Sequence, residues 1–374
     1  MLIKKMPTKT GLVLLHGGVG SGESNMEKND HTFHYQEDFA LESGDSLAGF
    51  QLKYTTLGRL NKDRSNVVWI CHALTGSSDF TDWWSGLFDE GRFFDPKQYF
   101  IICANVLGGC YGSTGPLSIN PRTGKPFYHT FPRVTNRDAV KAFDLLRKEL
   151  KMENVHTLIG GSLGGQQVVE WAIYQPDVFQ HIIPIATNAI FSPWGIAFNE
   201  AQRMAIEADA TWKEDQPRAG VDGLKAARAI GMISYRFYET YQKTQSEKNN
   251  ETLTDFRAAT YQRYQGQKLA NRFNAFTYWG LSAMMDSHNV GRNRTGVAEA
   301  LQKIRARTLV VGIDSDILFP VSEQKFMVDH IPDARLEIMT SLYGHDGFLV
   351  EFEQLSGHIQ KFFAQDHFSL RISV

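Results

Sequence analysis

The chain has 374 residues and is close to electroneutral, with 39 Lys and Arg against 41 Asp and Glu. This balance argues against a nucleic-acid binder, because such proteins usually gather an excess of basic residues on one face. No run approaches the ~20 consecutive apolar residues of a membrane-spanning helix, so we expect a soluble protein without a membrane partner. Three cysteines, Cys71, Cys103 and Cys110, are too few for a disulfide scaffold and indicate reduced thiols in a cytosolic enzyme.

The first part of the chain alternates short apolar runs with helical stretches. A glycine-rich tail is expected at residues 1–34, followed by strand candidates at 67–70, 100–102, 158–159 and 182–183. Between the second and third of these, Thr135 is a helix cap with Asp138 at capping-box distance, and Ala139, Phe143, Leu146 and Leu150 form the apolar stripe. This rhythm favours a parallel sheet with helices on both faces.

The alternation of strand and helix candidates stops near residue 190. Residues 196–290 contain helical windows rich in Ala, Gln, Arg and Tyr, interrupted by Pro217 and Gly220. Strand candidates return at 308–313 and 335–339, and a closing helix follows Gly347. We therefore expect an α/β core made of residues 35–190 and 301–374, interrupted by a helical insertion at 191–300.

The clearest chemical signal is a serine between glycines at residues 160–165. A strand candidate precedes Ser162 and a helical run follows it, with Gly160 and Gly164 two positions to either side. This is the nucleophile elbow, in which missing side chains allow a sharp turn that exposes the hydroxyl. A phosphate-binding loop would need a Gly-Lys-Ser/Thr sequence or another glycine spacing, and neither is present.

A serine hydroxyl needs a base, and the base needs an orienting carboxylate, in the chain order Ser, Asp, His. Asp316 lies just after the 308–313 strand candidate, and His345 lies in the loop after the next one. Catalytic loops gather at the carboxyl ends of parallel strands. We therefore predict a triad of Ser162, Asp316 and His345, with Asp314 as the alternative orienting carboxylate.

An oxyanion hole requires two backbone N–H groups, one of them from the residue after the nucleophile, here Leu163. The second is expected from the loop at residues 72–76, which follows the 67–70 strand candidate, with Leu74 as the donor. The sequence His16-Gly17-Gly18 is a competing match, but it lies in the expected tail, too far ahead of the core.

Taken together, these residues resemble the homoserine O-acyltransferase family of the α/β-hydrolase superfamily. The likeness runs from about Phe39 to the last helix, through residues 72–76, 105–116, 160–165, 264–266, 285–292, 316–320 and 344–346. The resemblance implies an α/β-hydrolase fold in which the helical insertion forms a lid over Ser162.

The resemblance also implies a ping-pong acyl transfer. Ser162 would take the acetyl group from acetyl-CoA, and the γ-hydroxyl of L-homoserine, deprotonated by His345, would then attack the acyl-enzyme. O-acetyl-L-homoserine, a methionine precursor, would be the product. The family match places the homoserine carboxylate on Arg236, although Ser234 and Phe237 depart from the usual motif, and the ammonium group on Asp346.

The residues also admit different roles and substrates. Asp346 fits a helix cap as well, and several arginines of the insertion are candidates for a solvent-facing role: Arg257, Arg263, Arg272, Arg292 and Arg294. Succinyl-CoA or L-serine would suit the same triad, since one methylene changes binding by only ~1–3 kcal/mol. Two further hypotheses are an esterase that uses water as the acceptor and a non-catalytic binding protein.

The lid has a chemical purpose under the transferase hypothesis, because a transferase must keep water from the acyl-enzyme. The resemblance further implies a homodimer formed through the lid helices. We expect no tightly bound cofactor, and no metal, because no Cys, His and Asp cluster has ligand spacing. A cytoplasmic location fits the reduced cysteines.

Overall fold

The computed structural model describes residues 28–372, with side chains up to Gln365. An eight-stranded sheet forms its centre, in the order β1-β2-β4-β3-β7-β8-β9-β10. The strands are β1 (Asn29–Ala40), β2 (Ser46–Leu57), β3 (Val67–Cys71), β4 (Phe100–Ala104), β7 (Val155–Gly161), β8 (Phe179–Ile185), β9 (Arg307–Ile313) and β10 (Ala334–Met339). From β4 to β10 all neighbours pair in parallel, whereas β1 and β2 are antiparallel.

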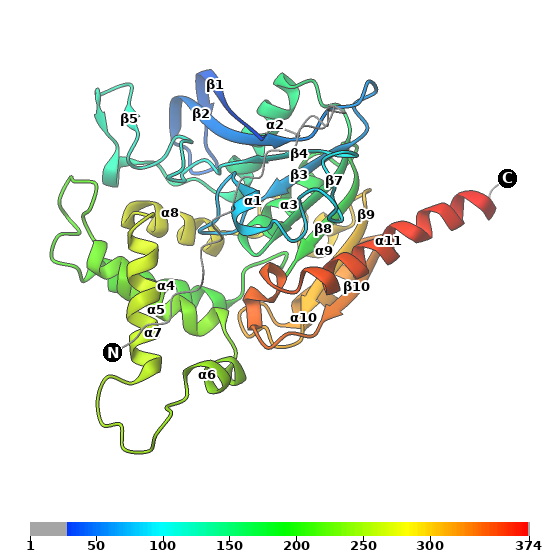
Figure 1. The fold of residues 1–374 in the computed structure, drawn as a ribbon. Coiled ribbons are helices and arrows are strands. Elements are labelled where there is room, and N and C mark those ends of the chain that lie inside the picture. The colour runs from blue at the N-terminus through cyan, green and yellow to red at the C-terminus, as the bar shows by residue number, and fades with distance from the viewer. Residues whose placement is uncertain (1–27, 373–374) are drawn as a thin grey trace, which may run out of the picture.

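Helices cover both faces of this sheet (Figure 1). They are α1 (Phe80–Trp83), α2 (Asn136–Glu149), α3 (Leu163–Tyr174), α9 (Val297–Leu301), α10 (Val321–His330) and α11 (Phe352–Ile372). Within β3, Trp69 belongs to the core shared with α2 and α3, and its neighbours Val68 and Ile70 belong to the core shared with α1 and α11. Every residue of β3 is therefore buried, which is typical of a parallel strand between two helical layers.

The predicted capping box of α2 is confirmed. The Thr135 side chain accepts a hydrogen bond from the Asp138 backbone N–H, and the Asp138 carboxylate accepts one from the Thr135 N–H. Ala139, Phe143 and Leu146 are buried as expected, whereas Leu150, the C-cap, is only partly buried. These caps fix where the helix begins and so how its apolar stripe meets the sheet.

The sheet begins earlier than the sequence indicated. Strand β1 starts at Asn29, so residues 29–34 belong to the sheet and not to the expected tail. The long hairpin of β1 and β2 was not predicted as such, because β1 is mostly exposed and a register shift between Tyr35 and Asp38 interrupts its alternation. A small second hairpin joins β5 (Ile119–Asn120) and β6 (Lys125–Pro126), ahead of the short helix η1 (Tyr128–Thr130).

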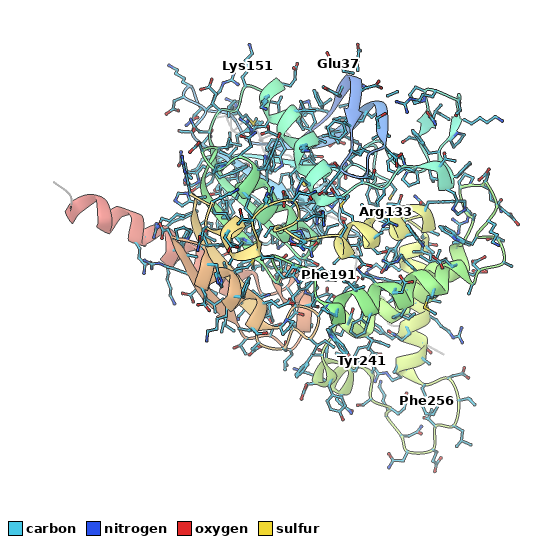
Figure 2. The ribbon with its side chains drawn as sticks, turned by 180° about the vertical axis from the view of Figure 1, so that it is seen from behind. Glu37, Arg133, Lys151, Phe191, Tyr241 and Phe256 are labelled. Atoms are coloured by element: carbon cyan, nitrogen blue, oxygen red, sulfur yellow. The ribbon has the colours of Figure 1, made fainter. Side chains whose placement is uncertain are left out.

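A helical segment separates β8 from β9. It contains α4 (Pro193–Glu207), α5 (Val221–Tyr235), α6 (Tyr238–Gln245), α7 (Arg257–Ala270) and α8 (Ala275–Asp286). Because β8 and β9 pair directly, the segment leaves and re-enters a continuous sheet. Figures 1 and 2 show it as a separate helical layer, with Tyr241 and Phe256 at the end remote from Glu37 and Lys151.

Two further features concern the whole described chain. Its three cysteines are free. None of the helices in residues 28–372 is long and apolar enough to cross a membrane.

Candidate active site

Ser162 occupies a sharp turn between β7 and α3. Its φ of 57° lies in the left-handed region, which is strained for a residue with a side chain. A Cβ added to Gly164 would lie 2.1 Å from the Cys71 carbonyl oxygen, and one added to Gly160 would lie 2.7 Å from Gly164. Both glycines are therefore required by close backbone approach, and the turn is pressed against the end of β3.

His345 and Asp316 form the expected pair. The His345 ring lies in the short helix η2 (Gly344–Leu349), and its Nδ1 lies 2.7 Å from Asp316 Oδ2. The other oxygen, Asp316 Oδ1, accepts hydrogen bonds from the backbone N–H groups of Leu318 and Phe319, each at 2.9 Å. Asp314 is exposed and its carboxylate faces the Ser341 N–H. The geometry therefore favours Asp316 over Asp314 as the orienting carboxylate.

Charge sets the protonation of His345. Burial of the ring opposes its positive charge, but the Asp316 carboxylate attracts and hydrogen-bonds it, and Asp346 adds a second negative charge. Together the carboxylates hold the pKa of His345 above its usual range. A ring with Nδ1–H donated to Asp316 presents Nε2 as the proton acceptor.

Ser162 and His345 line one cavity of about 190 Å³. Both residues are almost fully buried, at 5% and 3% exposure. No hydrogen bond joins the Ser162 hydroxyl to the His345 ring within the described chain. In enzymes without substrate such bonds are often long and tighten in the substrate complex.

The loop at residues 72–76 also borders this cavity. Leu74 and Gly76 line it beside Ser162. His72 holds the loop from the core side: its Nδ1 is 2.8 Å from the Ala73 carbonyl oxygen, and its Nε2 accepts the Val106 N–H at 3.0 Å. Burial lowers the pKa of His72 to about 4, so the ring stays neutral and keeps both bonds.

Leu163 is the first residue of α3, where backbone N–H groups have no partner inside the helix. Its N–H and that of Leu74 thus come from two segments that meet beside Ser162. The competing sequence His16-Gly17-Gly18 lies outside the described residues.

An arginine lines the cavity of Ser162, but it is not the one expected from the sequence. Arg228 lines it together with Ser162, Tyr235 and Asp346, and Arg236 lines a neighbouring cavity of about 140 Å³. The Arg228 guanidinium lies over the Tyr235 ring, 5.4 Å from its centroid, and its Nε is buried without a hydrogen-bond partner in the described structure. The family match selects Arg236 for this cavity and misses Arg228.

Arg236 instead forms an ion pair with Asp346, at 3.4 Å. Both side chains are about one-fifth exposed. The Asp346 carboxylate therefore stands between the cavity and Arg236, and it belongs to η2 rather than capping the final helix α11.

The remaining arginines of the helical segment lie in three kinds of surroundings. Arg257 and Arg263 are exposed on α7, as expected. Arg292 and Arg294 do not face solvent freely, because they pair with Glu42 and Glu170 of the core. Arg272 is exposed, as expected, and also lines the cavity of Ser162.

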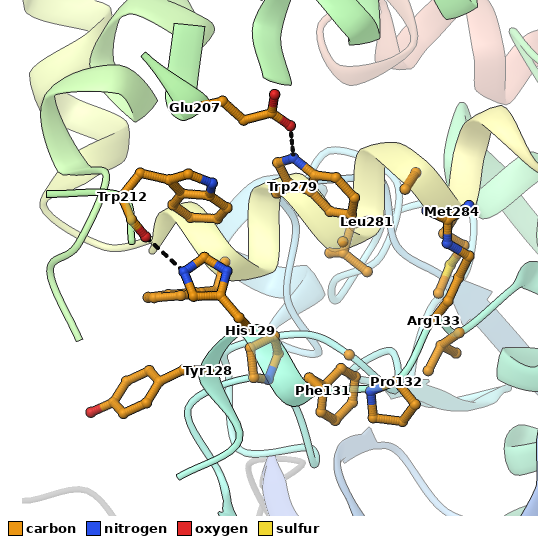
Figure 3. A pocket seen from close by; sticks show the side chains of 16 residues that line it. Tyr128, His129, Phe131, Pro132, Arg133, Glu207, Trp212, Trp279, Leu281 and Met284 are labelled. Carbon is orange, nitrogen blue, oxygen red and sulfur yellow. Dashed lines mark hydrogen bonds between the residues drawn. The ribbon is translucent and has the colours of Figure 1, made fainter. Parts of the chain in front are cut away.

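A larger cavity of about 310 Å³ lies elsewhere, between the loop at residues 128–134 and the helices α4 and α8 (Figure 3). Two of its polar side chains are engaged: His129 Nε2 lies 2.7 Å from the Trp212 carbonyl oxygen, and Trp279 Nε1 donates to Glu207. It shares no lining residue with the cavity of Ser162. The triad residues therefore mark the smaller cavity as the candidate site.

Comparison with known proteins identifies the family. Residues 66–352 match the model of the alpha/beta hydrolase fold family. A homoserine O-acetyltransferase of Cyclobacterium marinum is 50% identical over 342 residues, which cover 91% of this chain and 97% of the relative.

Solved structures agree on the fold. A homoserine O-acetyltransferase of Bacillus anthracis superposes with a TM-score of 0.83 at 23% identity, covering 90% of this chain and 97% of that one. Esterase E22 superposes with a TM-score of 0.81 at 22% identity, covering 90% and 100%. At such identities the structures establish the fold alone, and the sequence relatives decide the family. The chain belongs to the homoserine O-acetyltransferases, a family of the α/β-hydrolase fold.

Proposed function

We propose that this protein transfers the acetyl group of acetyl-CoA to the γ-hydroxyl of L-homoserine, giving O-acetyl-L-homoserine for methionine biosynthesis. The observation that carries the proposal is the His345–Asp316 pair, at 2.7 Å, opening on the same cavity as the strained Ser162. The name shared by the sequence relatives supports the choice of donor and acceptor.

In the first half-reaction Ser162 Oγ attacks the thioester carbonyl. His345 Nε2 takes the serine proton, Asp316 stabilises the imidazolium, and the N–H groups of Leu74 and Leu163 hold the oxyanion. The C–S bond then breaks and the proton passes to the departing thiolate. The products of this step are an acetyl-serine and free CoA.

In the second half-reaction the γ-hydroxyl of homoserine takes the place of the thiol. His345 Nε2 accepts its proton while the oxygen attacks the acetyl carbonyl. The bond to Ser162 Oγ breaks, and the proton returns from His345 to the serine. Serine and histidine thereby regain their starting protonation states, ready for the next acetyl-CoA.

Arg228 and Asp346 supply the two charges that an amino-acid substrate requires. A guanidinium offers parallel donors to the homoserine carboxylate, and Arg228 brings one into the cavity without a carboxylate partner among the described residues. Asp346 lines the same cavity and fits the ammonium group. This assignment replaces Arg236, which would instead hold Asp346 in place.

The helical segment would serve as the lid, because Arg228, Tyr235, Arg272 and Met285 from it close over Ser162. We also retain the proposed homodimer through this segment. Large apolar side chains exposed on its helices support it, among them Met204, Ile233 and Tyr264. A cytoplasmic location, where acetyl-CoA and homoserine are both at hand, completes the proposal.

An acceptor assay tests the function. Purified protein is incubated with acetyl-CoA or succinyl-CoA, and with homoserine, serine or no acceptor, while free thiol is followed. Release that depends on both acetyl-CoA and homoserine is expected, and Ser162→Ala should abolish it. Release without an acceptor would indicate a hydrolase, and a preference for succinyl-CoA or serine would overturn the stated substrates.

A further inference from the structure

Within the described residues, Arg272 of the helical segment donates a hydrogen bond to the oxyanion loop. We propose that Arg272 is a positioning residue that holds residues 72–76 so that the Leu74 N–H faces the oxyanion. This inference rests on the proposed function, because it assigns an oxyanion to the cavity of Ser162. It concerns acyl-enzyme formation with any acyl donor.

The contacts of Arg272 are specific. It follows α7, and its Nη1 donates to the Thr75 carbonyl oxygen at 2.7 Å and to the Tyr111 hydroxyl at 2.6 Å. The Tyr111 ring is fixed in turn against Phe273, at 5.9 Å between centroids. Thr75 adjoins Leu74, and its carbonyl belongs to the Thr75–Gly76 peptide unit, so the bond restrains the chain two peptide units after the one that carries the Leu74 N–H.

Other hydrogen bonds hold the rest of the loop. His72 and Val106 hold its start, and the Gly76 N–H closes a turn onto the Ala73 carbonyl oxygen at 2.9 Å. These bonds all come from the core or from the loop itself. Arg272 adds the anchor from the helical segment, next to Leu74.

Arg272 is also linked to the expected substrate arginine. The helices α5 and α7 approach closely at Gly266, where an added Cβ would lie 2.6 Å from the Lys225 carbonyl oxygen. Helix α5 carries Arg228 and Tyr235 into the cavity, and α7 leads directly into Arg272. One packed helix pair therefore positions both the amino-acid site and the oxyanion loop.

The test compares two acyl donors. Arg272→Gln and Arg272→Lys are assayed with acetyl-CoA and with p-nitrophenyl acetate, which has no phosphate groups. Loss of a whole oxyanion donor costs about 10²–10³ in kcat, and a displaced loop should cost at least about tenfold. We expect this fall in kcat with both donors, and a KM for acetyl-CoA within about twofold of wild type.

Arg263→Gln is the matched control, since it removes the same charge from an exposed position on α7. It should leave both reactions unchanged, and thermal melting of each variant checks folding. A rise in the KM for acetyl-CoA alone would assign Arg272 to donor binding and overturn the proposal. Full activity of both Arg272→Gln and Arg272→Lys would do the same, because the loop would then keep its position without the guanidinium.

This experiment distinguishes failure of the proposed acetyl transfer from failure of the proposed role of Arg272. A wild-type protein that acylates Ser162 from p-nitrophenyl acetate but transfers nothing to homoserine would overturn the proposed function. The effect of Arg272→Gln on p-nitrophenol release would still measure the oxyanion loop.

Discussion

The state of His345 depends on opposing effects at a single ring. Burial favours the neutral form, and the carboxylates of Asp316 and Asp346 favour the charged form. The carboxylates prevail, so the pKa of His345 is raised above its usual range. Since only neutral His345 accepts the serine proton, protonation of the ring inhibits the enzyme as the pH falls.

The pH profile of kcat/KM for thiol release should therefore lose activity on its acid side with a midpoint above the ordinary histidine value of about 6.5. In Asp316→Asn the carboxylate no longer attracts the charged His345 ring, but the ring stays buried. The midpoint of the profile should therefore move to lower pH. The same change should reduce kcat by about 10⁴, because the ring loses its orienting partner. A wild-type midpoint below 6.5 would contradict this account of the pair.

At the scale of one helix, the spacing on α5 explains which arginine enters the site. Arg228 and Tyr235 are seven residues apart, which is close to two helical turns, so both face the cavity. Arg236 is the C-cap, where the backbone turns extended and directs the side chain toward Asp346. The seven-residue spacing is present in the sequence, but comparing the residues next to each arginine with the family motif selects Arg236.

Arg228→Met should consequently raise the KM for homoserine by about 10–100-fold, the equivalent of one charged hydrogen-bonded contact. The KM for acetyl-CoA should change little. Arg236→Met is the matched variant and should have the smaller effect, since it acts only through Asp346. Initial rates with each substrate varied in turn provide the measurement. A larger effect of Arg236→Met on homoserine would restore the original assignment.

The elements differ in how far the sequence determines them. The parallel strands β3, β7 and β9 were predicted because buried strands read as continuous apolar runs. Strand β1 was not, since an edge strand shows only half its side chains to the core and its bulge breaks the alternation. The triad stays a prediction made from chain order and loop position, and the structure brings Ser162 and His345 to one cavity. The partners of Arg236 and Arg272 depend on tertiary packing, which no local pattern records.

At the scale of the whole molecule, an ion-pair network ties the end of the helical segment to the core. Glu42, just after β1, receives two hydrogen bonds from Arg292 at 2.9 Å each and one from Arg137 of α2 at 3.0 Å. Arg137 also pairs with Glu170 of α3, at 3.0 Å. The network therefore fixes the chain where it returns from the helical segment toward β9.

The ion-pair network lowers the pKa of Glu42. Burial of the carboxyl favours its neutral form, but the arginines outweigh burial and lower the pKa from 4.5 to about 2. A carboxylate with a lowered pKa stabilises the folded state above its unfolded value, and this stability is lost as the pH falls through the folded value. The contribution of Glu42 should thus be complete above about pH 5 and shrink toward pH 2.

Glu42→Gln keeps the size of the side chain and removes its charge, leaving Arg292 and Arg137 without their common partner. We expect a loss of about 3 kcal/mol in the free energy of unfolding at pH 7, the low end for breaking a buried pair. Asp38→Asn, which removes an exposed partner of Arg122, should cost less than about 1 kcal/mol. Urea unfolding at pH 7, 5 and 3 measures both variants against wild type. If the deficit of Glu42→Gln stays constant from pH 7 to 3, its charge is not what holds the helical segment to the core.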